Sequence, residues 1–393
     1  MHQADSLPQI TFFFRHINDL NFSMPLIMSA SNPRIFLYED INTEDRRIEL
    51  LRQEKVIIEK IHNPFINHIF NISDIFSAIL RKIGAITLAN FSARCLNHFG
   101  STLLVKNFLK ILKKDNFYIS DIFAFDHVDS KKSKMLIQTI RDEAPYGHVP
   151  KIISLPHGAD LHTGQMYFAH DHEPPLKTDF SHFDFVVCND PQHFDRMIGE
   201  KTLLESLFYT KYWFEYMNRS LLVDSRASNN DKKNIEVLFL LSKFSGNLNV
   251  HLSEIIRCIR IIGNFKNITL KIKPHPRGGL QEIQKVASKF DSVLIVGGDV
   301  QESIILSDCV INIDSSAVLD AFLANKPIIY PSFVSSNDFI KSVKDQLNIA
   351  NSPDEFYRFI LSLSRGDSLR LPKYKFIDWE DGIENWSNFF SSL

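Results

Sequence analysis

Short apolar runs alternate with amphipathic segments over much of the chain beyond residue 120. The runs 121–126, 151–155 and 183–188 predict buried strands, and the segment 130–141, with apolar positions every three or four residues, predicts a helix. Strands that alternate with helices are typical of a parallel sheet covered by helices. We therefore expect an α/β fold for this part of the chain.

The part that precedes it has a different pattern. Residues 1–30 show no regular period and are expected to be irregular, and residues 33–38 predict the first buried strand. Residues 43–61 and 63–114 repeat their apolar positions at helical spacing and predict helices.

A polar segment, 224–234, separates two regions of the same strand–helix pattern and predicts a linker. We expect a first domain over 1–223, a second over 235–350, and C-terminal helices in 351–393 that pack back across the domains. The predicted elements after the linker are strands 235–241, 268–272, 292–296, 309–313 and 327–330 and helices 252–262, 280–290, 315–323, 335–344, 353–363 and 379–390.

Composition removes several functional classes. The 393 residues include 44 Lys and Arg against 46 Asp and Glu, a formal net charge of −2, which excludes an electrostatic binder of nucleic acid. With 44% hydrophobic residues the chain is not disordered. Its cysteines are far apart and form no C-x-x-C pair, so we expect reduced, mostly buried thiols at Cys95, Cys188, Cys258 and Cys309.

The sequence favours a cytoplasmic protein. No run approaches the roughly 20 apolar residues of a membrane span, and the first residues lack the pattern of a secretory signal. Near the end of the long helical region, four lysines share one side of an apolar helix. We interpret them as the solvated face of a core helix, and leave open a peripheral contact with an anionic membrane through Lys106, Lys110, Lys113 and Lys114.

Polar residues directly after predicted strands are the candidates for chemistry, because ligands of open parallel sheets bind beyond the carboxyl ends of the strands. His157 follows strand 151–155 and has Gly158 beside it, the placement of a general base. It could equally form a structural hydrogen bond in a tight turn. Asp160 is the competing base.

The most specific local signal lies after strand 268–272. Two prolines, Pro274 and Pro276, restrict the backbone around His275, while Lys273 and Arg277 supply positive charge for a phosphate. The alternative is a solvated basic turn.

Two further segments follow strands of the second domain. Ser315 and Ser316 open the predicted helix 315–323 and would offer hydroxyls and backbone amides to a phosphate, or simply cap the helix. Ser242 and Lys243 lie in the first strand-to-helix loop, which matches neither a Walker A loop nor a Gly-x-Gly-x-x-Gly fingerprint.

A histidine-rich stretch complicates this interpretation. Six of the 15 histidines fall within 157–193, and residues 170–173 (His-Asp-His-Glu) have metal-ligand character. Two prolines follow them directly, so we favour an exposed polar loop and expect no metal site.

In combination, His157-Gly158, His275-Pro276 and Ser315-Ser316 resemble motifs of GT-B glycosyltransferases. The last two pairs are similar to the HP and SS motifs of bacterial sialyltransferases and of Kdo transferases in capsule assembly. The two histidines are also similar to those of CDP-glycerol glycerophosphotransferases. A departure is the acidic sialyltransferase motif of the N-terminal domain, which here has a counterpart only at residues 380–382.

The resemblance implies a GT-B fold, with two doubly wound Rossmann-like domains that face a cleft. It implies a metal-independent transferase of the cell envelope, moving a sugar from a CMP- or CDP-linked donor to a capsule polysaccharide, lipopolysaccharide or other saccharide or lipid-linked acceptor. No further cofactor is expected, since the donor is a co-substrate. The alternatives are a CDP-polyol phosphotransferase and a non-catalytic sugar-nucleotide-binding protein. The implied donor contacts are Ser242, Lys243, Lys273, His275, Arg277, Ser315 and Ser316.

Overall fold

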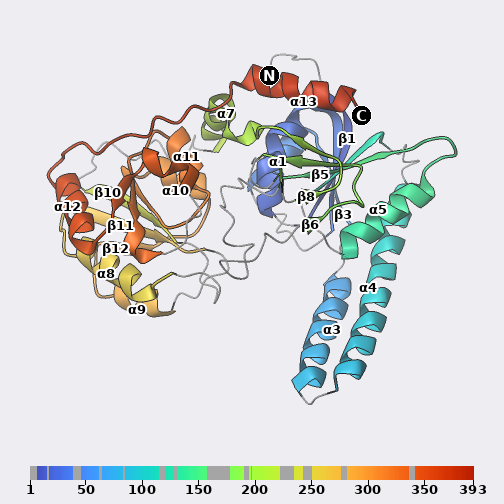
Figure 1. Cartoon of the computed structure of the whole chain (residues 1–393), viewed down its shortest axis with the longest axis horizontal. Coiled ribbons are helices and arrows are strands. Elements are labelled where there is room, and N and C mark those ends of the chain that lie inside the picture. Colours follow the sequence, from blue (N-terminus) through green and yellow to red (C-terminus); the bar gives the residue numbers. More distant parts are fainter. Residues whose placement is uncertain are drawn as a thin grey trace. The chain divides into compact units, whose positions relative to one another are not determined.

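The computed structural model describes residues 7–393 apart from 16, 39–45, 62–63, 83–84, 115–119, 127–130, 157–177, 190–193, 196, 222–233, 242–249, 276–280 and 336–340. The chain forms two units, each built on its own parallel sheet (Figure 1). Unit 1 comprises residues up to Ala159, Lys177–Phe208 and Glu380–Leu393, and the described residues of unit 2 lie within Tyr209–Trp379. The expected linker 224–234 lies almost wholly outside the described residues.

The sheet of unit 1 has seven strands in the order β3-β2-β1-β4-β5-β7-β9, and every neighbouring pair is parallel. The strands are β1 (Leu7–Phe14), β2 (Ala30–Leu37), β3 (Ile57–Lys60), β4 (Ile122–Asp126), β5 (Lys151–Leu155), β7 (Phe185–Cys188) and β9 (Lys201–Leu203). Two short strands, β6 (Thr178–Asp179) and β8 (Met197–Ile198), form a separate parallel pair.

The prediction that residues 1–30 are irregular is wrong. They contain β1, which lies between β2 and β4, and the helix α1 (Ile17–Ser29). Because β1 is covered on both faces, Phe12, Phe13 and Phe14 are all fully buried and the strand shows no alternation of polar and apolar residues. Pro25 lies inside α1 and weakens the helical pattern of residues 17–29 in the sequence.

The helix predicted over 43–61 is also partly wrong. The structure has a short helix, α2 (Arg46–Gln53), and then the edge strand β3. A strand of four residues is too short to display its own period against the helical pattern that precedes it.

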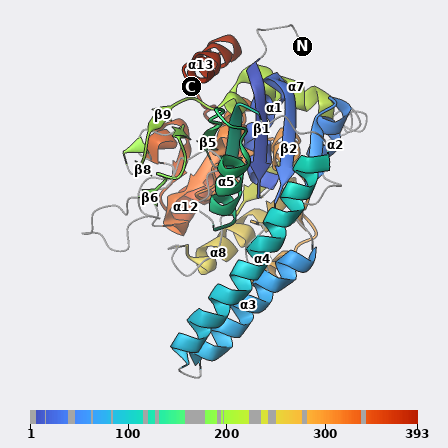
Figure 2. The ribbon, with the colours of Figure 1, turned by 90° about the vertical axis from the view of Figure 1, so that its right-hand side faces the viewer.

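The predicted helical region 63–114 is confirmed as two antiparallel helices, α3 (Pro64–Lys82) and α4 (Ile86–Lys114). This α3–α4 hairpin stands out from the sheet of unit 1 (Figures 1 and 2). At its base, Leu104 and Phe108 of α4 join the core of the unit, and α4 packs against α5 (Lys131–Glu143).

The sheet of unit 2 has the order β12-β11-β10-β13-β14-β15 and is again parallel throughout. All five strands predicted after the linker are confirmed, and β15 is an addition. The strands are β10 (Ile235–Leu240), β11 (Ile268–Lys273), β12 (Val293–Ile295), β13 (Cys309–Asn312), β14 (Ile328–Pro331) and β15 (Asn348–Ala350).

The predicted helices of unit 2 are confirmed with two corrections, and the structure adds two helices that were not predicted, at Lys211–Leu221 and Val300–Ile305. The predicted helix 315–323 begins only at Val318, and in 335–344 the described part holds a 3-10 turn, Lys341–Gln346, instead of an α-helix. The helices are α7 (Lys211–Leu221), α8 (Leu252–Gly263), α9 (Gln281–Ala287), α10 (Val300–Ile305), α11 (Val318–Leu323) and α12 (Pro353–Ser364).

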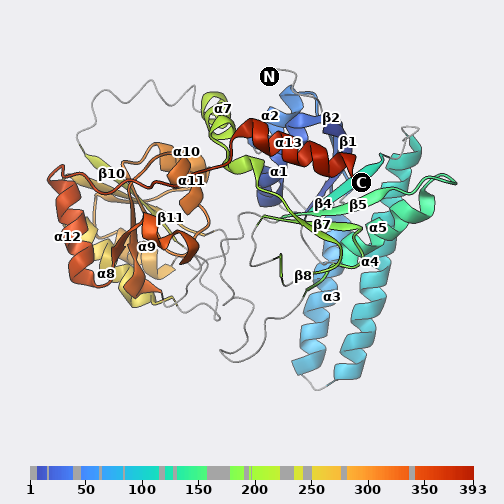
Figure 3. The same ribbon diagram turned by 45° about the horizontal axis from the view of Figure 1, so that its top comes forward.

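The C-terminal segment contributes to both units. The helix α12 packs against α8, β14 and β15 of unit 2. Most of α13 (Trp379–Ser391) belongs to unit 1 (Figure 3). There Phe389 packs edge-on against Phe185 of β7. Of the cysteines, Cys188, Cys258 and Cys309 are buried as expected, and Cys95 is exposed on α4. None of the helices in the described part of the chain is both long and apolar enough to cross a membrane.

Candidate functional site

The order of strands in unit 2 reverses between β10 and β13. Strands β11 and β12 lie to one side of β10, and the chain then returns to place β13, β14 and β15 on the other side. At such a switch point the loops after the two central strands diverge and leave room for a ligand. The loops that follow β10 and β13 therefore form the candidate ligand-binding edge of unit 2.

Strand register brings the predicted segments to this edge. Leu240 at the end of β10 pairs with Lys273 of β11 on one side and with Asn312 of β13 on the other. The three loops that follow thus start level with one another. His275 is partly buried and lies in the described part of its loop. Ser242, Lys243 and Arg277 lie outside the described residues.

Lys273 is already engaged within the protein. Its ammonium donates hydrogen bonds to the carbonyl oxygens of Gly297, at 3.0 Å, and Gly298, at 2.6 Å, in the turn after β12. Burial lowers the pKa of this lysine, and the carboxylates of Asp299 and Glu302 partly oppose that effect. The role that this geometry supports is to join the end of β11 to the β12 turn.

A buried carboxylate organises the turn after β13. Asp314 has a left-handed backbone, with φ of 50°, and accepts hydrogen bonds from the hydroxyl of Tyr330, at 3.0 Å, and from that of Ser335. Asn312, fully buried, donates from Nδ2 to the carbonyl oxygen of Ser315 at 3.0 Å. These bonds hold Ser315 in one position next to the switch point.

Ser315 and Ser316 are partly exposed, but they do not open a helix as predicted. They form a turn before α11, a helix of only six residues, and Ser315 Oγ accepts a hydrogen bond from the amide of Ala317 at 3.4 Å. The strained conformation of Asp314 delays the start of the helix. The two hydroxyls, and not a long helix dipole, are what this turn can offer to an anion.

Asp320 is a residue that sequence reasoning missed. It is buried in α11, where it accepts a hydrogen bond from Nε2 of Gln301 at 2.8 Å. Burial raises the pKa of its carboxyl group to about 7, with a further contribution from the charge of Asp299. An acidic residue inside the apolar segment 318–323 was the available signal.

The sheet of unit 1 has its own reversal, between β1 and β4. Arg15 follows β1 directly and is therefore a second missed candidate; the run of apolar residues in β1 was the signal that would have placed it. His157 and Asp160 lie outside the described residues, as does most of the histidine-rich stretch, including 170–173. Among the residues that the structure describes, no three His, Cys, Asp or Glu side chains gather as a metal site.

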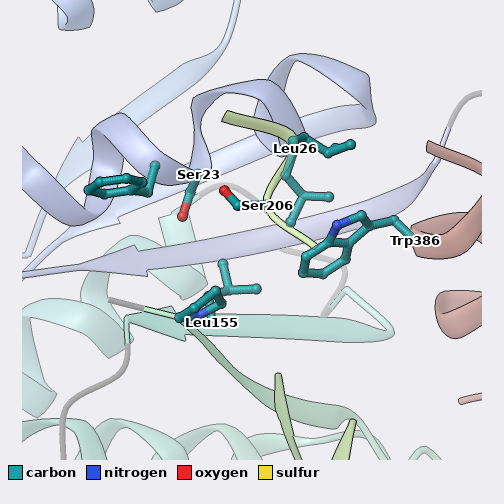
Figure 4. A pocket seen from close by; sticks show the side chains of 8 residues that line it. Ser23, Leu26, Leu155, Ser206 and Trp386 are labelled. Carbon is teal, nitrogen blue, oxygen red and sulfur yellow. The ribbon is translucent and has the colours of Figure 1, made fainter. Parts of the chain in front are cut away.

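A small, shallow pocket lies at the end of β5, and the volume of about 320 Å³ around it includes gaps between atoms and open solvent. Figure 4 shows Trp386 of α13 and Leu155 of β5 on its wall, and Trp386 is fixed there by a hydrogen bond of 3.1 Å from Nε1 to the carbonyl oxygen of Glu205. The wall is apolar apart from two serine hydroxyls, and it ends one residue before His157. Its lining is Phe22, Ser23, Leu26, Leu155, Pro156, Ser206, Leu207 and Trp386.

Comparison with known proteins gives a likeness in structure and none in sequence. No protein-family model and no curated protein matches the sequence. Among solved structures, UDP-GlcNAc 2-epimerase from Neisseria meningitidis bound to UDP-GlcNAc is similar, with a TM-score of 0.55, 10% identity, and 98% of this chain and 99% of that one covered. The epimerase from Methanocaldococcus jannaschii in complex with UDP-GlcNAc and UDP gives 0.56 at 10% identity, with the same coverage.

TarM gives a TM-score of 0.53 at 10% identity, again over 98% of this chain and 99% of that one. The chain has the GT-B fold. At this level of identity the likeness extends to the fold and not to activity or ligand.

Proposed function

We propose that this protein is a nucleotide-sugar-dependent glycosyltransferase that builds a bacterial surface polysaccharide or glycolipid. One observation carries the proposal: the strand order of unit 2 sets the turn of Ser315 and Ser316 at the switch point beside β10, and the loop of His275 directly on the other side of β10. Ligands of doubly wound sheets bind there. The turn is held rigidly by Asp314 and Asn312, so its hydroxyls are placed before a ligand arrives.

In the proposed reaction, His157 takes the proton from an acceptor hydroxyl, whose oxygen attacks the anomeric carbon of the donor sugar. The bond between that carbon and the phosphate oxygen breaks, and the nucleotide leaves with the electron pair. His275, Arg277 and the hydroxyls of Ser315 and Ser316 stabilise the negative charge on the leaving phosphate. Ser242 and Lys243 complete the donor contacts, and Lys273 supports the loop.

The acceptor is proposed to bind unit 1. The pocket at the end of β5 offers apolar walls, an indole and two hydroxyls, which suit a sugar ring or the apolar part of a lipid-linked saccharide. It reaches Pro156, directly before the proposed base. Asp160 is the alternative base.

Two observations bear on the nucleotide. The resemblance of the HP and SS pairs favours a CMP- or CDP-linked donor, whereas the structural neighbours were solved with UDP-GlcNAc or UDP. We propose a cytidine nucleotide and keep uridine as the competing choice. A CDP-polyol phosphotransferase would use the same cationic loops, with attack at phosphorus.

The test is a panel of CMP, CDP, UDP, GDP and UDP-GlcNAc in isothermal titration with the wild-type protein and with His275→Ala. Loss of one charge-assisted hydrogen bond should weaken the preferred nucleotide roughly 10- to 100-fold. The control is Ser364→Ala, whose backbone carbonyl binds Asn267 next to the opposite end of β11. Equal affinities in all three proteins would remove the phosphate-binding role of His275.

Turnover separates an enzyme from a binding protein. Incubation of the preferred sugar nucleotide with a saccharide acceptor should release free nucleotide, and the release should persist in excess EDTA if protein cations neutralise the phosphate. Tight binding without release would favour the non-catalytic alternative. Loss of activity in EDTA with recovery on adding zinc or manganese would instead assign metal ligands to the histidine-rich stretch.

A further inference from the structure

The α3–α4 hairpin exposes a series of large apolar side chains. On α3, Ile75 is 61% exposed, and on α4, Phe91 is 65% exposed. Six more bulky apolar residues of the hairpin are at least 43% exposed: Ile72, Phe76, Ile79, Ile86, Leu88 and Phe99. Contiguous apolar surface of this kind marks a site of interaction with a protein or a membrane.

The buried positions of the hairpin combine small and bulky residues. Ser73 and Ser77 of α3 and Gly100 of α4 are buried, and Ile69 and Leu80 are buried in the same row of α3 as the two serines. A helical hairpin in water normally buries its bulky apolar residues and keeps polar ones outside. Here several buried positions hold small residues while bulky apolar residues lie outside, a combination found in helix pairs in an apolar surrounding.

The exposed apolar residues form one surface. Ile72, Ile75, Phe76 and Ile79 follow each other at three- and four-residue spacing along α3, as do Leu88, Phe91, Cys95 and Phe99 along α4. At about 100° per residue, each row is offset from the buried row of its own helix by between about a third and just under a half of a turn, in the same rotational sense. An antiparallel pair has an approximate two-fold axis perpendicular to the plane of its two helices, so offsets of the same sense turn both rows towards the same side of the hairpin.

Charge decides the occupant of this surface. Residues 64–114 contain seven Lys and Arg and one acidic residue, in a chain that has a slight acidic excess overall. On α4 the row continues from Phe99 towards the base of the hairpin with Lys106 and Lys110, both exposed. A surface with apolar residues near the tip and lysines nearer the base matches a lipid bilayer with anionic headgroups.

We propose that the α3–α4 hairpin docks this protein on an anionic membrane surface, with Ile75, Ile79 and Phe91 entering the acyl boundary and Lys106 and Lys110 contacting headgroups. This goes beyond the proposed reaction and does not depend on it. The proposal replaces the interpretation of Lys106 and its neighbouring lysines as the solvated face of a core helix, because α4 joins the core of unit 1 only near the base of the hairpin. If the acceptor is lipid-linked, the hairpin also brings unit 1 to it.

The test is flotation of the full chain with vesicles of phosphatidylcholine, alone or mixed with phosphatidylglycerol. We expect flotation only with the anionic vesicles, and release by high salt. Ile75→Gln/Phe91→Gln should lose flotation, whereas the control Val149→Gln/Leu294→Gln, at exposed apolar positions outside the hairpin, should keep it. Lys106→Glu/Lys110→Glu should lower binding at least ~10-fold, and Lys266→Glu/Lys289→Glu should have little effect.

Size-exclusion chromatography with light scattering measures the oligomeric state and tests whether a second copy of the chain covers this surface instead of a membrane. Because the substituted side chains are exposed, the variants should keep the circular dichroism and Tm of the wild-type protein. Absence of flotation by the wild-type protein overturns the proposal. So does a wild-type dimer that becomes a monomer in Ile75→Gln/Phe91→Gln while vesicle binding stays unchanged.

Discussion

Two buried carboxylates near the end of β13 have different surroundings and different consequences. Asp314 is stabilised by two hydroxyl donors on neighbouring elements, Tyr330 and Ser335, and fixes the turn of the proposed donor site. Asp320 receives one amide donor, from Gln301, and lies near the like charge of Asp299. The first carboxylate supports the fold, whereas the second weakens it when ionised.

Asp320→Asn should therefore stabilise the protein at alkaline pH. The pKa of an aspartate carboxyl group is ordinarily 3.8 and is raised to about 7 in the fold, so between these pH values the unfolded chain has lost a proton that the folded chain keeps. Stability falls as pH rises through this window and levels off above it. Asparagine keeps an oxygen for Gln301 and has no charge, so the Tm of the variant should exceed that of the wild-type protein most at about pH 8.

The measurement is Tm against pH for the wild-type protein, Asp320→Asn and the control Asp367→Asn at an exposed position. Only Asp320→Asn should flatten the decline between acidic and neutral pH. Parallel curves for all three proteins would show that the carboxyl group is not the source of the decline.

At the scale of elements, Lys273 connects β11 to the turn after β12, and Gly298 in that turn has φ of 77°. Lys273→Met should leave the carbonyls of Gly297 and Gly298 without their donor and cost about 1–3 kcal/mol of unfolding free energy. Nucleotide affinity should stay near that of the wild-type protein, because the ammonium is already occupied.

Urea unfolding and isothermal titration together check this assignment. Lys285→Met, which removes only a surface pair with Glu282, is the matched control and should change stability by less than about 1 kcal/mol. A weaker nucleotide affinity with unchanged stability would return Lys273 to the donor contacts that the sequence predicted.

Elements whose pattern is local were predictable, and those defined by distant contacts were not. The strands of unit 2 are short apolar runs between amphipathic helices, so their positions follow from spacing alone. The central strand β1 was missed because burial on both faces removes alternation, and α1 because a proline lies within it. The start of α11 depends on Asp314 bonding to Tyr330 and Ser335, which no local pattern reveals.

For the site, sequence predicted which segments carry polar residues, and the sheet order decides which of them meet. The pairing of Leu240 with Lys273 and Asn312 brings three loops level, a result of topology and register. The use of Lys273 within the fold and the burial of Asp320 depend on side-chain packing, so neither was predictable from residue type.

At the scale of the whole molecule, both units repeat one plan. In each, the first strand lies inside the sheet, the next two add on one side and the fourth begins the other side. Each unit therefore has its own switch point and its own edge for a ligand. A reaction between two substrates can use two such edges, which fits the proposed donor in unit 2 and the proposed acceptor in unit 1.

The proposed placement of the donor in unit 2 and of the acceptor in unit 1 predicts different effects for the two histidines. A general base acts on the acceptor and contributes about 10²–10⁴-fold to the rate. His157→Gln should therefore lower turnover by roughly that factor and leave nucleotide affinity unchanged, whereas His275→Ala should lower both. The turnover rate of the wild-type protein should decrease when the pH is lower than the pKa of the imidazole, because the base is then protonated. This acidic limb of the pH–rate profile should disappear in His157→Gln.

Asp160→Asn supplies the paired comparison, because its carboxylate is the competing base three residues further on. If His157 is the base, Asp160→Asn keeps substantial activity and the acidic limb of the pH profile. If Asp160 is the base, Asp160→Asn is the inactive variant with normal nucleotide binding, and His157→Gln retains activity because the imidazole only shapes the turn. Steady-state turnover over a range of pH, with nucleotide titration of the same preparations, decides between the two residues.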